Sequence, residues 1–320
     1  MRPQVVAALG GGHGLAATLS ALRFLTDEIT AIVTVADNGG SSGRLREEFG
    51  VLPPGDLRMA LAALCDESEW GHTWRDVLQH RFAGEGPLAG HALGNLLIVT
   101  LWELLDDPVS GLDLVGRLLR SSGRVLPMAA VPLDIEADVV GHDESDEAVL
   151  TITGQAEVAT TTHRVREVRL VPSQPPAYPE SVAAIRAADW VVLGPGSWFT
   201  SVMPHLLVPD VREALAVTRA KRVLVLNLEV GVKETVGFTP AEYLQSFRAY
   251  APDVPLDVVL ADPSIGSDEG LRAACEELGA ELVIAPMAAR DRPGAHDRLR
   301  LAAALQDVMA WHPGTNGVAG

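Results

Sequence analysis

The chain has 320 residues, 48% hydrophobic and only 5% aromatic, and its formal net charge is −17. Charge of this sign disfavours nonspecific binding to nucleic acid and to anionic membrane surfaces. No apolar run approaches membrane-spanning length, and the N-terminal one is too short for a secretory signal. We therefore expect a cytoplasmic protein with no nucleic-acid partner and no membrane insertion. Cys65 and Cys275 lack metal-ligand spacing and are expected to be reduced core residues.

Apolar strand-like runs alternate with helix-like segments along most of the chain. Strands are predicted at 4–9, 29–36, 124–128, 189–193, 222–228, 257–261 and 281–284. Helices are predicted at 14–24, 56–66, 73–82, 91–105, 109–120, 180–187, 210–219, 239–250, 269–279 and 297–310. Such an order predicts an α/β fold with a Rossmann-like, doubly wound, mostly parallel sheet.

Three segments depart from this simple alternation. Residues 56–120 form a helical block between two strands and are predicted to be a cap insertion. Residues 134–171 alternate apolar and polar positions in short runs, which predicts a small antiparallel excursion at the sheet edge. Residues 1–312 are expected to form a single domain, followed by a frayed tail at 313–320.

The first glycine-rich turn lies between the first strand and the first helix. It contains Gly11, Gly12, His13 and Gly14. A strand, glycine turn and helix in this order place a phosphate at a helix N-terminus. The Walker lysine is missing, and Leu15 stands where the dinucleotide fingerprint needs its third glycine. Such turns also occur without any ligand, so this one does not define a site by itself.

The most informative segment follows the strand predicted at 29–36. Its residues are Asp37, Asn38, Gly39, Gly40, Ser41, Ser42, Gly43 and Arg44. Glycines let backbone N–H groups approach an anion, serine hydroxyls donate to it, and arginine offers a fork of donors that matches phosphate. This composition predicts a loop that binds a phosphorylated ligand.

A third glycine-rich turn follows the strand predicted at 189–193. It contains Gly194, Gly196 and Ser197, with Ser201 close behind. The carboxyl ends of parallel strands meet at one edge of a sheet, so a doubly wound sheet would bring all three turns together there.

Four further residues are candidates for the same site. Asp56 follows two prolines and a glycine, where it is placed to cap the next helix, and Arg58 lies close enough to reach back to an anion. His91 and Asn95 are four residues apart and share a helix face. They are predicted either to contact a ligand or, alternatively, to cap the helix (His91) and tie down a neighbouring loop (Asn95). No Ser/His/Asp signature or zinc spacing is present.

Taken in order, these motifs resemble the gluconeogenesis factor YvcK family, within the superfamily that includes CofD, the 2-phospho-L-lactate transferase. The similarity spans nearly the whole chain, and the stretch from Thr34 to Arg46 is highly specific. His13 stands where many relatives have Thr, which resembles the actinobacterial branch. The resemblance implies a cytoplasmic regulator of cell shape on gluconeogenic carbon sources that binds UDP-sugars, notably UDP-N-acetylglucosamine or UDP-glucose. Under this interpretation no cofactor is required.

The superfamily also implies an alternative function, a Mg²⁺-dependent transferase of the 2-phospho-L-lactate type, with Asp37 and Asp56 handling the metal. A homo-oligomer and regulators of cell-wall synthesis are compatible with the resemblance as partners. An NAD-dependent oxidoreductase is disfavoured because the dinucleotide fingerprint fails.

Two positions depart from the family pattern. Asn38 stands where relatives commonly carry a second acid, which removes one anionic ligand for Mg²⁺. The segment between Asn227 and Glu234 lacks the usual Pro-Gly, so its contacts with a ligand are in question.

Overall fold

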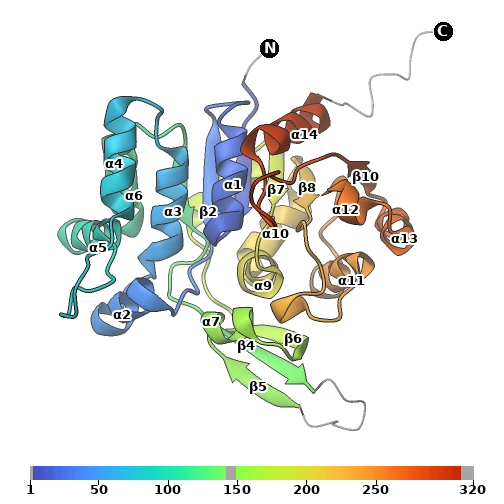
Figure 1. Ribbon diagram of the computed structural model, residues 1–320, viewed down its shortest axis with the longest axis horizontal. Coiled ribbons are helices and arrows are strands. Elements are labelled where there is room, and N and C mark those ends of the chain that lie inside the picture. Colours follow the sequence, from blue (N-terminus) through green and yellow to red (C-terminus); the bar gives the residue numbers. More distant parts are fainter. Residues whose placement is uncertain (1–2, 142–148, 311–320) are drawn as a thin grey trace.

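The computed structural model describes residues 3–141 and 149–310, and its centre is a seven-stranded sheet (Figure 1). The strand order is β10-β9-β8-β7-β1-β2-β3, and all neighbouring strands are parallel. The strands are β1 (Val6–Gly10), β2 (Ile29–Val33), β3 (Arg124–Pro127), β7 (Trp190–Leu193), β8 (Lys221–Val225), β9 (Val258–Ala261) and β10 (Glu281–Ile284). The predicted doubly wound sheet is confirmed. Its order reverses between β1 and β7, which makes this pair the topological switch point.

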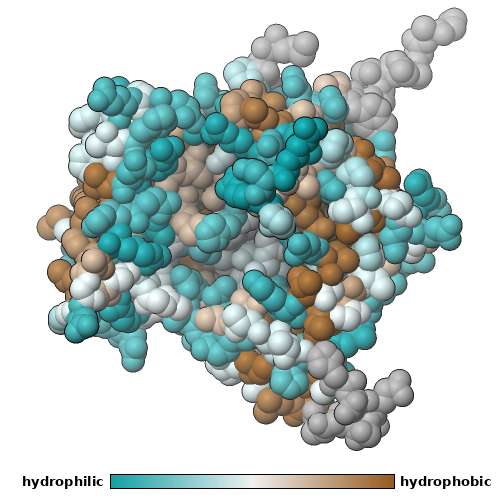
Figure 2. All heavy atoms as spheres, in the orientation of Figure 1, coloured by the Kyte–Doolittle hydropathy of each residue, from teal (hydrophilic) through white to brown (hydrophobic). Residues whose placement is uncertain are grey.

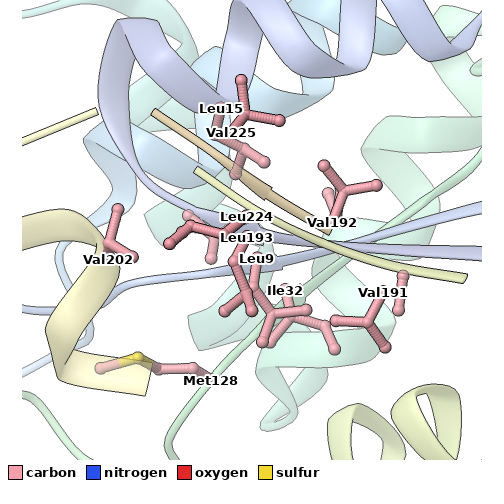
Figure 3. Packing of buried hydrophobic residues seen from close by; sticks show 14 of the residues in the cluster. Leu9, Leu15, Ile32, Met128, Val191, Val192, Leu193, Val202, Leu224 and Val225 are labelled. Carbon is pink, nitrogen blue, oxygen red and sulfur yellow. The ribbon is translucent and has the colours of Figure 1, made fainter. Parts of the chain in front are cut away.

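The core is a row of aliphatic side chains that crosses the central strands. Leu9 of β1 is in register with Ile32 of β2 and with Leu193 of β7, and Leu193 is in register with Leu224 of β8. All four are completely buried, and they lie together in Figure 3. Because consecutive residues of these strands are buried, both faces of the sheet are covered, as parallel sheets require.

Helices flank the sheet. They are α1 (Gly12–Leu22), α2 (Gly40–Phe49), α3 (Pro54–Leu64), α4 (Glu69–Gln79), α5 (Leu93–Leu105), α6 (Pro108–Leu119), α7 (Gln155–Thr160), α8 (Pro179–Ala187), α9 (Met203–Leu207), α10 (Pro209–Val217), α11 (Pro240–Tyr250), α12 (Pro263–Gly266), α13 (Glu269–Leu278) and α14 (Arg298–Ala310), with a π-helical turn η1 (Trp198–Val202) and a 3₁₀ turn η2 (Lys233–Thr235). Figure 1 shows α1 in front of the sheet, beside α3 and α14. None of the helices within the described ranges has the length and apolar content needed to cross a bilayer.

The helical insertion predicted between the second and third strands is present as α3 to α6, preceded by α2. Helix α3 packs on α1 and contacts β2 and β3, and α5 packs on α6. The insertion therefore extends the layer that covers the sheet, and α2 and α3 begin at the carboxyl end of β2.

The antiparallel excursion is also confirmed, as a separate sheet in the order β5-β4-β6. Its strands are β4 (Asp134–Val140), β5 (Leu150–Thr153) and β6 (Arg164–Val171). It lies beyond the carboxyl ends of the parallel strands, where α7 contacts η1 and η2 (Figure 1). The predicted tail at 313–320 and residues 142–148 of the predicted excursion lie outside the described residues.

Candidate functional site

The first and third glycine-rich turns meet at the switch point. A β-carbon on Gly14, at the start of α1, would overlap the carbonyl oxygen of Pro195. A β-carbon on Gly196 would lie 3.7 Å from the carbonyl oxygen of Gly11. The buried Thr18 hydroxyl donates to the Gly194 carbonyl oxygen at 3.0 Å. The two turns therefore form one surface at the carboxyl edge, with His13 and Ser197 exposed on it.

The second turn joins this surface through two carboxylates. A β-carbon on Gly11 would lie 2.6 Å from Asp56 Oδ2 and 3.3 Å from Ser201 Oγ, and one on Gly55 would lie 2.9 Å from Asp37 Oδ2. The face that Figure 2 shows is hollowed near its centre, among hydrophilic side chains, where α1, α2, α7 and α9 approach one another in Figure 1. Gly11, Asp37, Asp56 and Ser201 lie close together at this edge of the sheet, and we call their cluster the switch-point hollow.

Helices α1 and α2 begin in the same way, each with an extended glycine followed by a left-handed one. Gly12 has φ 54° and Gly40 has φ 50°, and neither helix is capped by the side chain of its own N-cap residue. Uncapped N–H groups at a helix start attract anions. The segment from Gly40 to Gly43 was expected to be a loop, but it forms the first turn of α2. Both glycine-rich turns therefore offer an anion the N-terminus of a helix, α1 for the first turn and α2 for the second.

The electrostatics of the switch-point hollow are dominated by Asp56. Burial, together with the neighbouring Asp37 carboxylate, raises the pKa of Asp56 to about 7, against the backbone N–H of Gly12 and the Arg58 guanidinium. The N-cap of α3 is Pro53, so Asp56 does not cap α3 as expected, and its carboxyl group instead faces the start of α1. Thr34 Oγ1 is buried here without a hydrogen-bond partner among the described residues.

Two carboxylates are a suitable protein contribution to a Mg²⁺ site. Mg²⁺ keeps several waters and is usually held by one or two carboxylates together with substrate phosphates. Asp37 and Asp56 fit this pattern, because burial and the neighbouring Asp37 carboxylate oppose the ionisation of Asp56, and a cation would offset both effects. Within residues 3–141 and 149–310 no group of three or more His, Cys, Asp or Glu side chains is arranged to hold a metal by itself.

Four of the predicted site residues form a buried network behind the start of α2. Ser41 Oγ lies 3.0 Å from His91 Nδ1 and accepts a hydrogen bond from Asn95 Nδ2 at 3.0 Å, while Arg58 Nε donates to Asn95 Oδ1 at 2.8 Å. All four side chains are buried. Asn95 therefore joins Ser41 in the first turn of α2 to Arg58 of α3. His91 does not cap α5, whose N-cap is Ala92.

The remaining candidates hold neighbouring segments in place. Ser42 Oγ accepts a hydrogen bond from the Gly55 N–H at 2.8 Å. Arg44 is exposed and donates to the carbonyl oxygens of Pro87 and Ala89, so it points to the segment between α4 and α5. A β-carbon on Gly43 would overlap the carbonyl oxygen of Asn38.

Sequence reasoning gave little weight to the residues that fasten the third turn. Asn227 binds Gly196 twice, accepting from its N–H at 2.9 Å and donating to its carbonyl oxygen at 2.8 Å. Glu234 Oε1 accepts from the Phe199 N–H at 3.2 Å, and burial raises the pKa of Glu234 to about 7. The segment after Asn227 therefore supports the turn from behind. Thr34 belongs to the stretch that resembles the family, but it was not among the predicted site residues because it lies near the end of an apolar strand.

Asn38 joins the second turn to the excursion. Its Oδ1 accepts from the Ala156 N–H at 2.9 Å, and its Nδ2 donates to Glu157 Oε2 at 2.9 Å. In Asn38→Asp the new side chain still accepts the hydrogen bond from Ala156, but it loses the donor to Glu157 and places a second carboxylate beside that of Glu157. Because Glu157 is exposed, we expect the free energy of unfolding to fall by only about 1 kcal/mol, measured by urea denaturation.

A double variant tests this interpretation of Asn38. Adding Glu157→Gln to Asn38→Asp restores a donor opposite the new carboxylate and should recover most of the loss. Equal losses in the single and double variants would contradict the proposed contact.

These features define a doubly wound α/β protein whose glycine turns and two carboxylates collect at the topological switch point. Residues 6–298 match the family described as 2-phospho-L-lactate transferase CofD. The chain belongs to this family, and its curated relatives carry the name that the motifs indicated.

The chain is 52% identical to the putative gluconeogenesis factor of Mycobacterium tuberculosis (strain H37Rv), over 97% of this chain and 92% of that protein. It is 36% identical to the gluconeogenesis factor of Bacillus subtilis, over 82% and 80% respectively. A crystal structure of a UPF0052 family member from Bacillus halodurans superposes with a TM-score of 0.84 at 30% identity, covering 96% of this chain and 100% of that one.

Proposed function

We propose that the protein is a gluconeogenesis factor that binds a UDP-sugar, UDP-N-acetylglucosamine or UDP-glucose, and acts as a cytoplasmic regulator of cell shape and cell-wall homeostasis on gluconeogenic carbon. The support for the first part is the name shared by its relatives. The observation that supports nucleotide-sugar binding is the contact between the two turns at the switch point, beside the uncapped start of α1. Ligands of doubly wound sheets bind at this position.

The proposed ligand matches the chemistry of the switch-point hollow. Its diphosphate would accept hydrogen bonds from the N–H groups of the Gly11–Gly14 turn and from Ser197 and Ser201. The uncapped start of α2 at Gly40 adds further donors. Asp37 would accept hydrogen bonds from ribose or sugar hydroxyls.

A thermal-shift titration tests this proposal. We expect UDP-N-acetylglucosamine to raise the Tm of the full chain and NAD to leave it unchanged, because a ligand bound only to the folded state stabilises it. Gly11→Ala should abolish the shift, because its β-carbon would lie 2.5 Å from Thr34 Cγ2 and 2.6 Å from Asp56 Oδ2. A wild-type protein that responds to no UDP-sugar would refute the proposal.

The proximity of Asp37 and Asp56 favours one second candidate, a Mg²⁺-dependent transferase of the 2-phospho-L-lactate type. The two carboxylates would hold Mg²⁺, which would neutralise charge on the donor phosphates. Asn38 supplies no third carboxylate, because its side chain is an amide, and that amide is bound to α7. Mg²⁺-dependent consumption of a nucleotide diphosphate donor, lost in Asp37→Asn, would establish this activity.

A further inference from the structure

A second cavity, which we call the arginine cavity, lies beside the first turns of α2. Its volume is about 810 Å³, within the usual range for small-molecule sites. Its charged lining consists of Arg44, Arg46, Glu47 and Arg81, and none of Gly11, Asp56 or Ser201 lines it. Gly40, Ser41 and Gly43 of the second turn also line it. The cavity therefore adjoins the switch-point hollow at the start of α2, but its charged side chains are different ones.

Two of the arginines keep most of their hydrogen-bonding capacity free. Arg44 donates from one nitrogen to Pro87 O at 3.3 Å and from another to Ala89 O at 2.8 Å, and Arg81 donates to Gly90 O at 2.8 Å. A guanidinium carries five N–H donors, so most of those on Arg81 and several on Arg44 remain available. Neither side chain forms an ion pair with any residue in the described ranges, although the whole chain carries a net charge of −17.

The other two charges refine the chemistry of the cavity. Arg46 is already paired with Asp134 at 2.8 Å and donates to the Leu133 carbonyl oxygen, so it contributes little net charge. Glu47 is an exposed carboxylate on the same lining. A carboxylate beside an anion site repels phosphate but accepts hydrogen bonds from hydroxyl groups. A ligand with a phosphate at one end and hydroxyl groups elsewhere can bind the free arginines and the Glu47 carboxylate at the same time.

We propose that the arginine cavity binds a phosphate monoester that carries hydroxyl groups, as a second ligand separate from the nucleotide sugar. Arg44 and Arg81 hold the phosphate through paired N–H donors, and Glu47 accepts from hydroxyls. The same arginines anchor the segment between α4 and α5, and Ser41, which lines the cavity, binds His91 and Asn95. Occupancy of the cavity is therefore linked to the position of α2, which also borders the switch-point hollow.

Isothermal titration of the full chain with glucose 6-phosphate tests the proposal, with glucose and citrate as comparison ligands at constant ionic strength. We expect saturable binding of glucose 6-phosphate and none of glucose. In the double variant R44Q/R81Q the affinity should fall at least tenfold. The variant R44K/R81K keeps both charges but loses the paired donors of the guanidinium groups, so its affinity should lie between those of wild type and R44Q/R81Q. It replaces R44Q/R81Q in the test if that variant is poorly folded. R166Q removes an exposed arginine outside the cavity and should change nothing.

The outcomes separate this site from the nucleotide-sugar site. Gly11→Ala should abolish UDP-N-acetylglucosamine binding and leave glucose 6-phosphate binding intact. Equal affinity of wild type and both double variants for glucose 6-phosphate would overturn the proposal, as would loss of its binding in Gly11→Ala. Citrate binding tenfold tighter than glucose 6-phosphate through the same arginines would also overturn it, in favour of a polycarboxylate. If the protein binds glucose 6-phosphate but no UDP-sugar, the proposed function is refuted and the inference about the arginine cavity is retained.

Discussion

Asp56→Asn is expected to remove the pH dependence of UDP-N-acetylglucosamine binding in the absence of Mg²⁺. The Asp56 carboxyl group faces the Gly12 N–H at the start of α1, where the diphosphate is proposed to bind. Above its pKa of about 7, Asp56 becomes a carboxylate that competes for this N–H group and repels the phosphates. Binding coupled to uptake of one proton weakens up to tenfold for each pH unit above that value.

The sign of the effect on stability follows from the same pKa shift. The pKa of Asp56 is raised from 3.8 to about 7 on folding, so the folded state binds this proton more tightly than the unfolded state. The contribution to stability is fully present below pH 4 and is lost as the pH rises towards 7. Glu234, with a pKa also raised to about 7, contributes in the same direction. The ligand-free Asp56→Asn variant should therefore retain part of the pH dependence of unfolding.

Titrations at pH 6, 7 and 8, each with EDTA or Mg²⁺, provide the measurement. In EDTA we expect the wild-type Kd to rise across this range and the Asp56→Asn Kd to stay nearly constant. Asp27→Asn, which removes an exposed acid elsewhere, is the control and should behave as wild type. If Mg²⁺ tightens wild-type binding at pH 8 and Asp56→Asn loses this gain, the two carboxylates bind the metal. A wild-type Kd independent of pH and of Mg²⁺ would contradict the position assigned to the diphosphate.

The sheet was predictable because its strands are buried on both faces and read as continuous aliphatic runs. Val191 to Leu193 and Val6 to Leu9 are examples, each followed by glycines that end the strand. Helix α2 was missed because Gly40, Ser41, Ser42 and Gly43 are poor helix formers, and the helix there is favoured by tertiary bonds such as that from the Gly55 N–H to Ser42. Helix propensity depends on the local sequence and does not include a hydrogen bond to a distant segment.

The residues that make up the site were more predictable than the direction in which their side chains point. The glycine turns and Asp37 could be read from strand ends, since a polar residue directly after a buried strand reaches the carboxyl edge. Whether Arg58 and Asn95 face a ligand or each other depends on the packing of α3 against α5, which sequence spacing does not specify. The same holds for Arg81, which enters the arginine cavity from a segment without any motif.

Gly14→Ala is expected to separate the two turns at the switch point and to weaken both stability and ligand binding. Its β-carbon would overlap the Pro195 carbonyl oxygen and lie 2.6 Å from Gly196 Cα. Both neighbours are backbone, so no side-chain rotation relieves the overlap. Overpacking of this kind costs about 1–3 kcal/mol, which should lower the Tm by several degrees. Affinity for UDP-N-acetylglucosamine should fall with it, because the two turns supply donors to the same diphosphate.

Gly116→Ala is the matched control, because it makes the same substitution within another helix, α6. Its β-carbon would meet only Ser121 and Leu61, at 3.8 and 3.9 Å, which is ordinary contact. Alanine is favoured over glycine in a helix interior by about 1 kcal/mol, so Gly116→Ala should stabilise the protein. Helix propensity acts in the same direction at Gly14, and only the contact with Pro195 opposes it. A Gly14→Ala protein as stable as Gly116→Ala would therefore show that the two turns do not touch, and the shared diphosphate site would lose its structural basis.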